Sequence, residues 1–456
     1  MKMKRRFLQA AIFSMIFMGA VMAQTQQAPP LLQPDPRYKA DILVVVAHPD
    51  DETEVTPYLA QQIEEYHRRV AVIFGTRGNG GGNAEGEEQA AALGAEREIE
   101  ARRALAYLGV MNVWFMNGPD TPGQNVLRSL ETWNHGTSLD QMVRLFRLTR
   151  PEVILTWLPH YVAGENHGDH QAAGVIATEA FDLAGDATWF PEQIAAPRNR
   201  QGIGNLTEGL HPWQPKKIYY FTDASHTGFL KGQGPVYVDT GISPTRHLPY
   251  YRIAAEEMKF HLTQDDTGQL AKQALATGNL SFFKQPVRLI FGKSLVPSAP
   301  TADVFEGVDA KPIPFATHPG YHPATHSSLS IELGGPFAFY QRFWPAHGLD
   351  HLSSLLPPEV EIGARVLHVP VLIHNDTDSA REVTLQVALP EGWTAQAGPA
   401  IYPVPPHQTY PAECVILAPP GQVGSWNNVG IHAKSSGSEV GALTIRVHLA
   451  NGGLPQ

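Results

Sequence analysis

Residues 41–52, DILVVVAHPDDE, decide the fold of the chain and contain its first candidate reactive side chains. The aliphatic run at 43–46 is too short for a helix, and its flanks predict a fully buried strand. One histidine, two aspartates and one glutamate follow within residues 47–52. Open α/β proteins place their chemistry in loops at the carboxyl ends of strands. We therefore predict a reactive loop at the end of a central strand, although Asp50 or Asp51 could simply cap the next helix.

A second stretch with histidines and a carboxylate, ENHGDH at residues 165–170, follows the fourth predicted strand. In a parallel sheet it falls at the same edge as His48. His167 and His170 flank Asp169, a pattern typical of metal sites in which the aspartate would orient a histidine. The simpler interpretation is a helix start with Asp169 in its first turn. The two stretches together predict a metal site more specifically than either does alone.

From residue 41 onward, short aliphatic strands alternate with helical stretches. This alternation indicates a mostly parallel sheet with helices on both faces, so we predict a Rossmann-like α/β domain. Gly109 ends the strongest helix, and Pro151 follows another. The predicted strands are 43–46, 70–74, 113–116, 153–157 and 217–221, and the predicted helices are 89–108, 139–150, 170–184 and 250–264.

At 456 residues the chain is long enough for about two or three domains. Its C-terminal part contains short alternating stretches separated by Pro, Gly and Asn turns, which predict an Ig-like β-sandwich. The predicted sandwich strands are 365–374, 381–389, 410–417, 426–433 and 442–449. The predicted divisions are a signal peptide at 1–23, a disordered lead-in at 24–40, an α/β domain at 41–296, an irregular linker at 297–350 and the sandwich at 351–456.

The N-terminus has the features of an export signal. Four basic residues within positions 2–6 precede an apolar run at 7–22, and Ala23 supplies the small residue that cleavage requires. The run is too short for a comfortable membrane span, so we expect cleavage before Gln24, no stable span afterwards, and a periplasmic or extracellular protein. Removal of the four basic residues changes the formal net charge from −10 to −14, which argues against nucleic acid as a partner.

The available residue types limit the kind of metal site that can form. Cys414 is the only cysteine, so the chain cannot form an internal disulfide, and a metal must be bound by His, Asp or Glu. A catalytic zinc site has three protein ligands and one open position for water. The ligands would be His48, Asp51 and His170. Asp50 could take a proton from the water, and His167 could face the developing oxyanion or protonate the leaving amine.

AHPDDE after the first strand and HGDH after the fourth resemble the PIG-L/LmbE-like zinc deacetylases. That family includes enzymes that act on N-acetylglucosaminyl-phosphatidylinositol, on mycothiol and bacillithiol precursors, and on glycopeptide antibiotics. The resemblance covers roughly residues 41–264. It also includes TRG at 76–78, REIEARRALAYLG at 97–109 and KFHLTQ at 259–264. The chain departs from the family at Asn79, where Glu is frequent, and at Gly168, where Pro is frequent.

The resemblance gives a role to each residue that matches the family motifs. It implies that one zinc ion per chain is bound by His48, Asp51 and His170, that Asp50 is the general base, and that His167 lies on the oxyanion side. The expected function is an exported zinc-dependent hydrolase that removes acetyl from an N-acetylated amino sugar, with metal-bound water as the nucleophile. Two alternatives stay open: a zinc hydrolase of another amide or of an O-acetyl ester, and a non-catalytic exported carbohydrate-binding protein.

The C-terminal part has a resemblance of its own. Residues 370–393, PVLIHNDTDSAREVTLQVALPEGW, resemble the NEW3-type sandwich that is attached to exported glycosidases. This resemblance implies either a sugar-binding module or a spacer, and both interpretations stay open.

Overall fold

The computed structural model describes residues 34–161, 167–186, 188–190, 193, 210–224, 228–238, 241–264, 266–309, 328–353, 355, 357–363, 365–396, 401–420 and 424–450. The expected signal peptide at 1–23 and most of the expected lead-in at 24–40 lie outside the described residues, as do residues 165 and 166. Among the helices in the described part of the chain, none is both long enough and apolar enough to cross a membrane.

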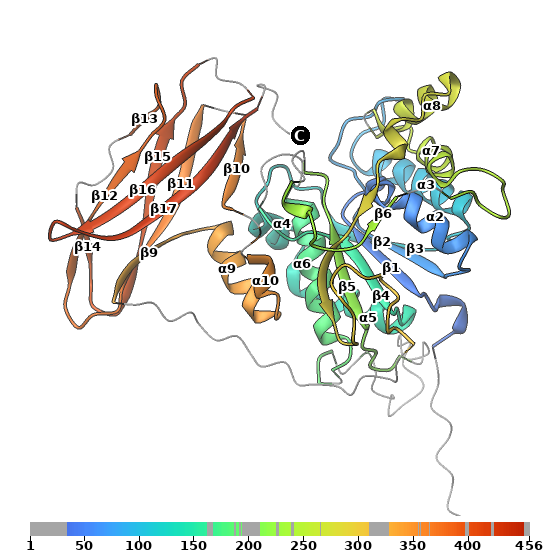
Figure 1. Ribbon diagram of the computed structural model, residues 1–456, viewed down its shortest axis with the longest axis horizontal. Helices are drawn as coiled ribbons and strands as arrows, with labels where there is room; N and C mark the ends of the chain where they lie inside the picture. The colour runs from blue at the N-terminus through green and yellow to red at the C-terminus, as the bar shows by residue number, and fades with distance from the viewer. Residues whose placement is uncertain are drawn as a thin grey trace, which may run out of the picture.

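Six strands form the main sheet in the order β3-β2-β1-β4-β5-β8, and Figure 1 shows this sheet between two groups of helices. Strands β1 to β5 run parallel, and β8 pairs antiparallel with β5 at the edge. The predicted mostly parallel α/β fold is therefore confirmed. The strands are β1 (Ile42–Val46), β2 (Val70–Thr76), β3 (Asn112–Gly118), β4 (Val153–Trp157), β5 (Lys217–Phe221) and β8 (Ile290–Ser294).

The burial of the central strands is typical of a parallel sheet. Every residue of β1, β4 and β5 is buried, and β1 is an unbroken aliphatic run. Strands covered by helices on both faces have such continuous apolar sequences. Helices α5 and α6 pack together on one face, with α6 against β1 and β4, whereas α2, α3 and α7 lie on the other side of the sheet (Figure 1).

The helices of the α/β region are α2 (Thr56–Glu64), α3 (Ala91–Leu108), α4 (Val126–Thr132), α5 (His135–Thr149), α6 (Gly168–Leu183), α7 (Tyr250–Met258) and α8 (Thr267–Thr277). Shorter elements are η1 (Pro36–Tyr38), η2 (Asp51–Glu54), η5 (Gly228–Leu230), η6 (Phe282–Lys284), β6 (Val236–Tyr237) and β7 (Val287–Arg288). Helix α3 ends as predicted at Gly109, whose φ of 89° is the left-handed conformation that glycine adopts without strain.

The prediction of one helix over 250–264 is wrong beyond Met258. Helix α7 ends there, and residues 259–264 form a connector that leads toward α8. The connector leaves the helix because its polar groups bond elsewhere: Thr263 N lies 3.2 Å from both carboxylate oxygens of Glu100, and Gln264 Nε2 donates to the carbonyl oxygen of Pro49. A continued helix would withdraw Thr263 and Gln264 from these partners.

The C-terminal strands form two sheets that share one hydrophobic core, so the predicted sandwich-like region is confirmed. The five-stranded sheet has the order β10 (Glu359–Ile362), β17 (Ser438–Leu449), β16 (Trp426–Ser435), β12 (Arg381–Ala388) and β14 (Tyr402–Val404). The four-stranded sheet has the order β13 (Thr394–Ala395), β15 (Gln408–Leu417), β11 (Val366–Asn375) and β9 (Leu329–Leu333). Alternate residues such as Val369, Val371 and Ile373 of β11 point into the core, as expected for strands with one buried face.

The expectation of an irregular linker over 297–350 is wrong for its second half. Strand β9 pairs with β11 inside the sandwich, and α9 (Pro336–Ala346) and α10 (Asp350–Ser353) follow. Tyr340 and Trp344 of α9 belong to the same core cluster as the parallel sheet, because their large aromatic side chains pack against it. The domain boundaries themselves stay predictions, but α9 connects the sandwich to the α/β region (Figure 1).

Gly174 allows α6 to pack closely on the end of β4, and this packing gives the first prediction. A Cβ at Gly174 would lie 2.2 Å from the carbonyl oxygen of Trp157, a distance that forces the backbone to move. Gly174→Ala should therefore lower the free energy of unfolding by about 1–3 kcal/mol, as overpacking does. The matched control is Gly136→Ala in α5, where an added Cβ meets nothing within 4 Å. Thermal unfolding measures both, and equal melting temperatures would contradict the prediction.

Candidate metal centre

The two predicted histidine-containing loops meet at the carboxyl edge of the sheet, where β1 and β4 lie side by side. The strand that follows β1 in sequence, β2, lies on one side of β1, whereas β4 and β5 lie on the other. Such a reversal of strand order creates a crevice outside the strand ends, which is where open α/β sheets bind ligands. His48 reaches this crevice directly after β1, and His167 and His170 reach it from the start of α6.

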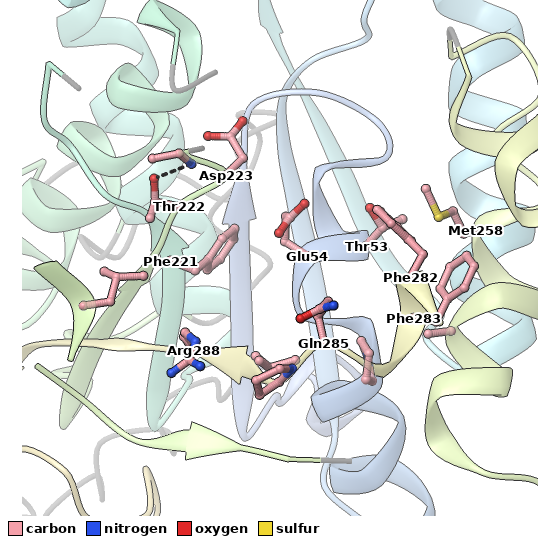
Figure 2. Close-up of a pocket in the computed structure, with 16 residues that line it drawn as sticks. Thr53, Glu54, Phe221, Thr222, Asp223, Met258, Phe282, Phe283, Gln285 and Arg288 are labelled. Atoms are coloured by element: carbon pink, nitrogen blue, oxygen red, sulfur yellow. Dashed lines mark hydrogen bonds between the residues drawn. The ribbon is translucent and has the colours of Figure 1, made fainter. Parts of the chain in front are cut away.

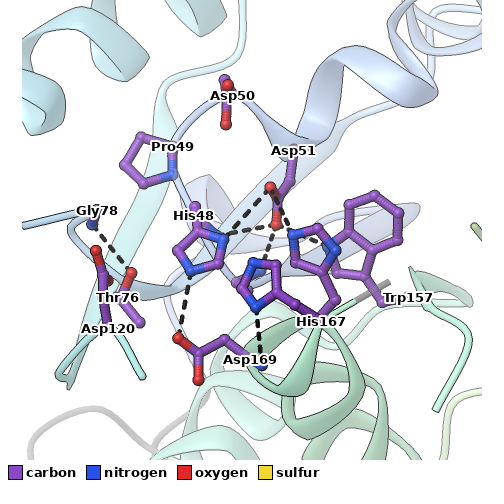
Figure 3. Close-up of polar contacts among 12 residues, drawn as sticks. His48, Pro49, Asp50, Asp51, Thr76, Gly78, Asp120, Trp157, His167 and Asp169 are labelled. Carbon is purple, nitrogen blue, oxygen red and sulfur yellow. Dashed lines mark hydrogen bonds and ion pairs between the residues drawn. The ribbon is translucent and has the colours of Figure 1, made fainter. Parts of the chain in front are cut away.

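Three imidazoles gather in this crevice, as Figure 3 shows for His48, His167 and the neighbouring residues. The ring centroids of His48 and His170 are 5.3 Å apart, and the ring of His167 lies 4.7 Å from the first and 4.0 Å from the second. One ring nitrogen from each of the three lies within 4.8 Å of the others, close enough to hold one cation. The expected meeting of residues 122 positions apart is thus observed.

Asp51 completes the predicted ligand set. Its Oδ1 atom lies 3.3 Å from His170 Nε2 and 3.7 Å from His48 Nδ1. Tetrahedral ligands at about 2.1 Å from a zinc ion are about 3.4 Å apart. The two distances from Asp51 Oδ1, to His170 Nε2 and to His48 Nδ1, are therefore close to the spacing of ligands around zinc. His167 adds a fourth group on the same side, so the residues present fit the predicted metal.

The other oxygen of Asp51 fixes the carboxylate in place. Oδ2 accepts hydrogen bonds from Ala47 N and His48 N, both at 2.9 Å, and from Trp157 Nε1 at 2.7 Å. Burial opposes ionisation, but the His170 and His48 imidazoles hold the pKa of Asp51 well below its ordinary value. Asp51 is therefore ionised and held in a fixed orientation, with Oδ1 toward His170 and His48. Trp157 could not be singled out from the sequence, because the last residue of a buried strand resembles ordinary core.

Trp157 also positions His170. The indole of Trp157 stacks on the imidazole at a centroid distance of 4.1 Å and an angle of 3°. Its side chain is 1% exposed, so neighbouring core residues hold the ring. One residue at the end of β4 thus contacts two of the three predicted ligands, through its N–H group on Asp51 and its ring face on His170.

A carboxylate lies next to each of the two histidines that the sequence predicts as ligands. His48 Nε2 lies 3.4 Å from Asp169 Oδ2, and His170 Nδ1 lies 3.3 Å from Asp223 Oδ2. A carboxylate that accepts from one ring nitrogen leaves the other nitrogen free for a metal. The role proposed for Asp169 from the sequence agrees with this contact. Asp223 was not predicted, although its position two residues after a predicted strand was a usable signal.

His167 is held by a different contact, because it is the N-cap residue of α6. Its Nδ1 atom accepts a hydrogen bond from Asp169 N at 3.3 Å. Burial, followed by repulsion from His170 and His48, lowers the pKa of His167 well below its ordinary value. A neutral ring whose Nδ1 accepts carries its proton on Nε2, so His167 offers a hydrogen-bond donor to the crevice.

Asp50 lies beyond Pro49, apart from the three histidines, in Figure 3. Its Oδ2 atom accepts from Thr267 Oγ1 at 3.1 Å, and its backbone N–H donates to Glu52 Oε2 at 3.0 Å. Burial and the neighbouring Asp51 carboxylate raise the pKa of Asp50 to about 7. Asp50 therefore lies apart from the three histidines and has a pKa suited to proton transfer near neutral pH.

A pocket of about 580 Å³ lies next to the centre, at the carboxyl end of β5 (Figure 2). Asp223 links the pocket to the histidine cluster, because it lines the pocket and also contacts His170. Phe221, Met258 and Phe282 supply apolar surface, and Glu54 and Arg288 supply charges. The volume lies within the range of about 300–1,000 Å³ that small-molecule sites have.

Comparison with known proteins gives a consistent picture for the α/β region. Residues 43–181 match the family model described as PIG-L: GlcNAc-PI de-N-acetylase. The 1D-myo-inositol 2-acetamido-2-deoxy-alpha-D-glucopyranoside deacetylase of Thermobifida fusca (strain YX) is 26% identical over 193 residues, which are 39% of this chain and 60% of that protein. The protein of the same name from Tsukamurella paurometabola is 28% identical over 254 residues, which are 49% of this chain and 82% of that protein.

Among solved structures, the conserved protein TT1542 from Thermus thermophilus is 17% identical and superimposes with a TM-score of 0.37. That superposition covers 58% of this chain and 100% of the other. This chain spans 60% and 56% of the length of the first two curated relatives that it matches.

Trp157→Phe separates the two contacts of Trp157 and gives the second prediction. Phenylalanine keeps a ring against His170 but has no N–H group for Asp51 Oδ2. Loss of a group that orients a ligand typically weakens metal binding by about 10- to 100-fold, so we expect a loss of zinc affinity in that range. Competition with a chelator of known affinity measures it. The control is Trp213→Phe, which removes an indole bond to the carbonyl oxygen of Pro151 at the other end of the sheet. Unchanged affinity in Trp157→Phe would contradict the proposed role.

Proposed function

Because residues 43–181 belong to the PIG-L/LmbE-like family of GlcNAc-PI de-N-acetylases, we propose that this protein is an exported zinc-dependent hydrolase that removes acetyl from an N-acetylated amino sugar. The observation that carries the proposal is the position of Asp51 Oδ1, 3.3 Å from His170 Nε2 and 3.7 Å from His48 Nδ1. The curated relatives act on a 2-acetamido-2-deoxy-glucopyranoside, which supports an acetamido sugar as the substrate class.

The donor set supports zinc as the cofactor. Two imidazole nitrogens and one carboxylate oxygen are a ligand combination that catalytic zinc sites use, with one position left for water or substrate. When bound, zinc supplies a water that is acidic near neutral pH and polarises the substrate carbonyl. His48, Asp51 and His170 would hold the ion, and Asp169 and Asp223 would keep the two histidines in the orientation that presents their free nitrogens.

Two further residues have the properties that amide hydrolysis requires. Asp50, with a pKa of about 7, would accept a proton from the attacking water and pass it on to the leaving amine. His167, neutral and protonated on Nε2, would donate a hydrogen bond to the oxygen that becomes negative as the carbonyl is attacked. A buried donor of this kind contributes strongly because little water competes with it.

Acetate release tests the proposed reaction and its metal dependence. We expect release from N-acetylglucosamine glycosides, loss of that activity after dialysis against a chelator, and recovery with one equivalent of zinc per chain. An O-acetylated sugar without an acetamido group serves as the comparison substrate. Faster release from the O-acetyl ester would favour an esterase, and activity that survives complete removal of the metal would contradict the proposed chemistry. Absence of any hydrolysis with the metal bound would favour a binding protein.

Export is the second part of the proposal and has its own test. The basic residues at positions 2–6 and the apolar run at 7–22 support it. We expect the mature protein to start at Gln24 and to be recovered outside the cytoplasm, which N-terminal sequencing of fractionated cells measures. A variant with Ala23→Asp should stay unprocessed, since cleavage requires a small residue there. Export would be contradicted if the protein in the cytoplasmic fraction still began at Met1 and none were found outside the cytoplasm.

A further inference from the structure

A second group of buried ionisable residues lies outside the metal centre and consists of Glu52, Glu257 and His261. All three side chains are 0% exposed. His261 Nε2 lies 3.0 Å from Glu52 Oε1 and 3.8 Å from Glu257 Oε1. Burial by itself lowers the pKa of His261, but the two carboxylates raise it well above its ordinary value. A protonated His261 between two carboxylates forms a charge-assisted bond, which is stronger than a neutral hydrogen bond.

Glu52 connects this group to the reactive loop. While Oε1 faces His261, Oε2 accepts the hydrogen bond from Asp50 N at 3.0 Å. Both oxygens of Glu52 are therefore engaged, one on each side. Glu52 therefore links His261 to Asp50, and these two residues are 211 positions apart in the sequence.

The backbone of Asp50 needs such support. Its φ of 108° lies in the region that residues with a side chain rarely adopt. A conformation of this kind persists only where the surrounding structure enforces it, and it is found most often at functional sites. The backbone N–H of Asp50 points at Glu52, so Glu52 holds the strained residue at its amide.

The connector that contains His261 holds the same loop at two other points. Thr267 Oγ1, at the start of α8, donates to Asp50 Oδ2 at 3.1 Å, and Gln264 Nε2 donates to the carbonyl oxygen of Pro49. The connector is itself anchored, because Thr263 Oγ1 donates to Glu100 Oε2 at 2.8 Å and Arg97 Nη2 donates to the carbonyl oxygen of Thr263 at 3.0 Å. Asp50 is thus held at its amide by Glu52, which His261 contacts from the connector, and at its carboxylate by Thr267 at the start of α8.

We propose that His261, acting through Glu52, and Thr267, acting directly, are positioning residues that hold the Asp50 carboxylate in the orientation needed for hydrolysis. The inference rests on the proposed function, in which Asp50 is the proton acceptor. It assigns a task to the KFHLTQ stretch at 259–264, which lies outside the metal centre. Neither residue is expected to bind the metal, since both act on Asp50 and not on the three ligands.

Thr267 gives the milder of two tests, because its side chain is half-buried and we expect its replacement to leave the fold intact. Thr267→Val removes the hydroxyl that bonds to Asp50 Oδ2, and kcat should fall about 3- to 10-fold, the equivalent of one hydrogen bond. KM and zinc content should not change. Thr267→Ser keeps a hydroxyl and should restore kcat. The control is Thr277→Val at the other end of α8, which should leave kcat unchanged. Equal kcat in Thr267→Val and wild type would overturn the role of Thr267.

His261→Asn gives the second test, through a double-mutant cycle with Asp50→Asn. Asp50→Asn alone should lower kcat by about 10²- to 10⁴-fold, the contribution of a general base. His261→Asn alone should lower kcat by about 10²-fold, since a misplacement of about 1 Å has this effect. In the Asp50→Asn background, His261→Asn should cause no further loss, because the group that it positions is already gone. An undiminished loss in that background would overturn the inference.

Metal content distinguishes positioning from a metal-binding role of this group. Wild type and His261→Asn should both bind one zinc ion per chain. A second equivalent in wild type that is lost in His261→Asn would make the Glu52, Glu257 and His261 group a metal site and overturn the inference. Wild-type protein without deacetylase activity would overturn the proposed function and this inference together, whereas an active wild type with unaffected variants would overturn this inference alone.

Discussion

The bonds of the Asp51 carboxylate join the two halves of the metal centre. Its Oδ2 atom accepts from two backbone N–H groups at the end of β1, those of Ala47 and His48, and from the indole of Trp157 at the end of β4. Three donors on one buried carboxylate oxygen leave it no freedom to rotate. Oδ1 must therefore face His170 and His48, and the geometry of the centre depends on β1 and β4 staying side by side.

The same edge of the sheet supplies the carboxylates that contact His48 and His170. Asp169 comes from the first turn of α6 after β4, and Asp223 comes from the segment after β5. Carboxyl ends of neighbouring parallel strands lie together, so three consecutive strands of the sheet can each contribute to one site. Gly174 contributes to the same arrangement from inside α6, because only a residue without a side chain lets the helix lie against the end of β4.

The C-terminal region is connected to the helix that carries His170. Tyr340 of α9 donates to the side chain of Gln171 at 2.7 Å, one residue after that histidine. His347, directly after α9, lies 2.7 Å from Asp182 near the other end of α6. Because α9 contacts both ends of α6 and leads back to β9 of the sandwich, the two regions are packed against each other.

Much of this could be predicted from the sequence, because it depends on residue type and local spacing. The aliphatic run before His48 and the alternation of strands and helices determined the mostly parallel sheet, and the two polar stretches determined which histidines and aspartates would meet. The strand β9 and the end of α7 at Met258 could not be predicted in this way, because each depends on a distant partner: β11 for the strand, and Glu100 and Pro49 for the connector.

The sequence by itself therefore determined the fold class and the composition of the centre, since hydrophobic periodicity and strand-end position are local properties. Only the tertiary structure decided that Trp157 would contact Asp51, that Asp223 would contact His170, and that His261 would reach Asp50 through Glu52. These contacts join residues up to 211 positions apart, and which side chains meet across such distances is decided by how the helices pack on the sheet.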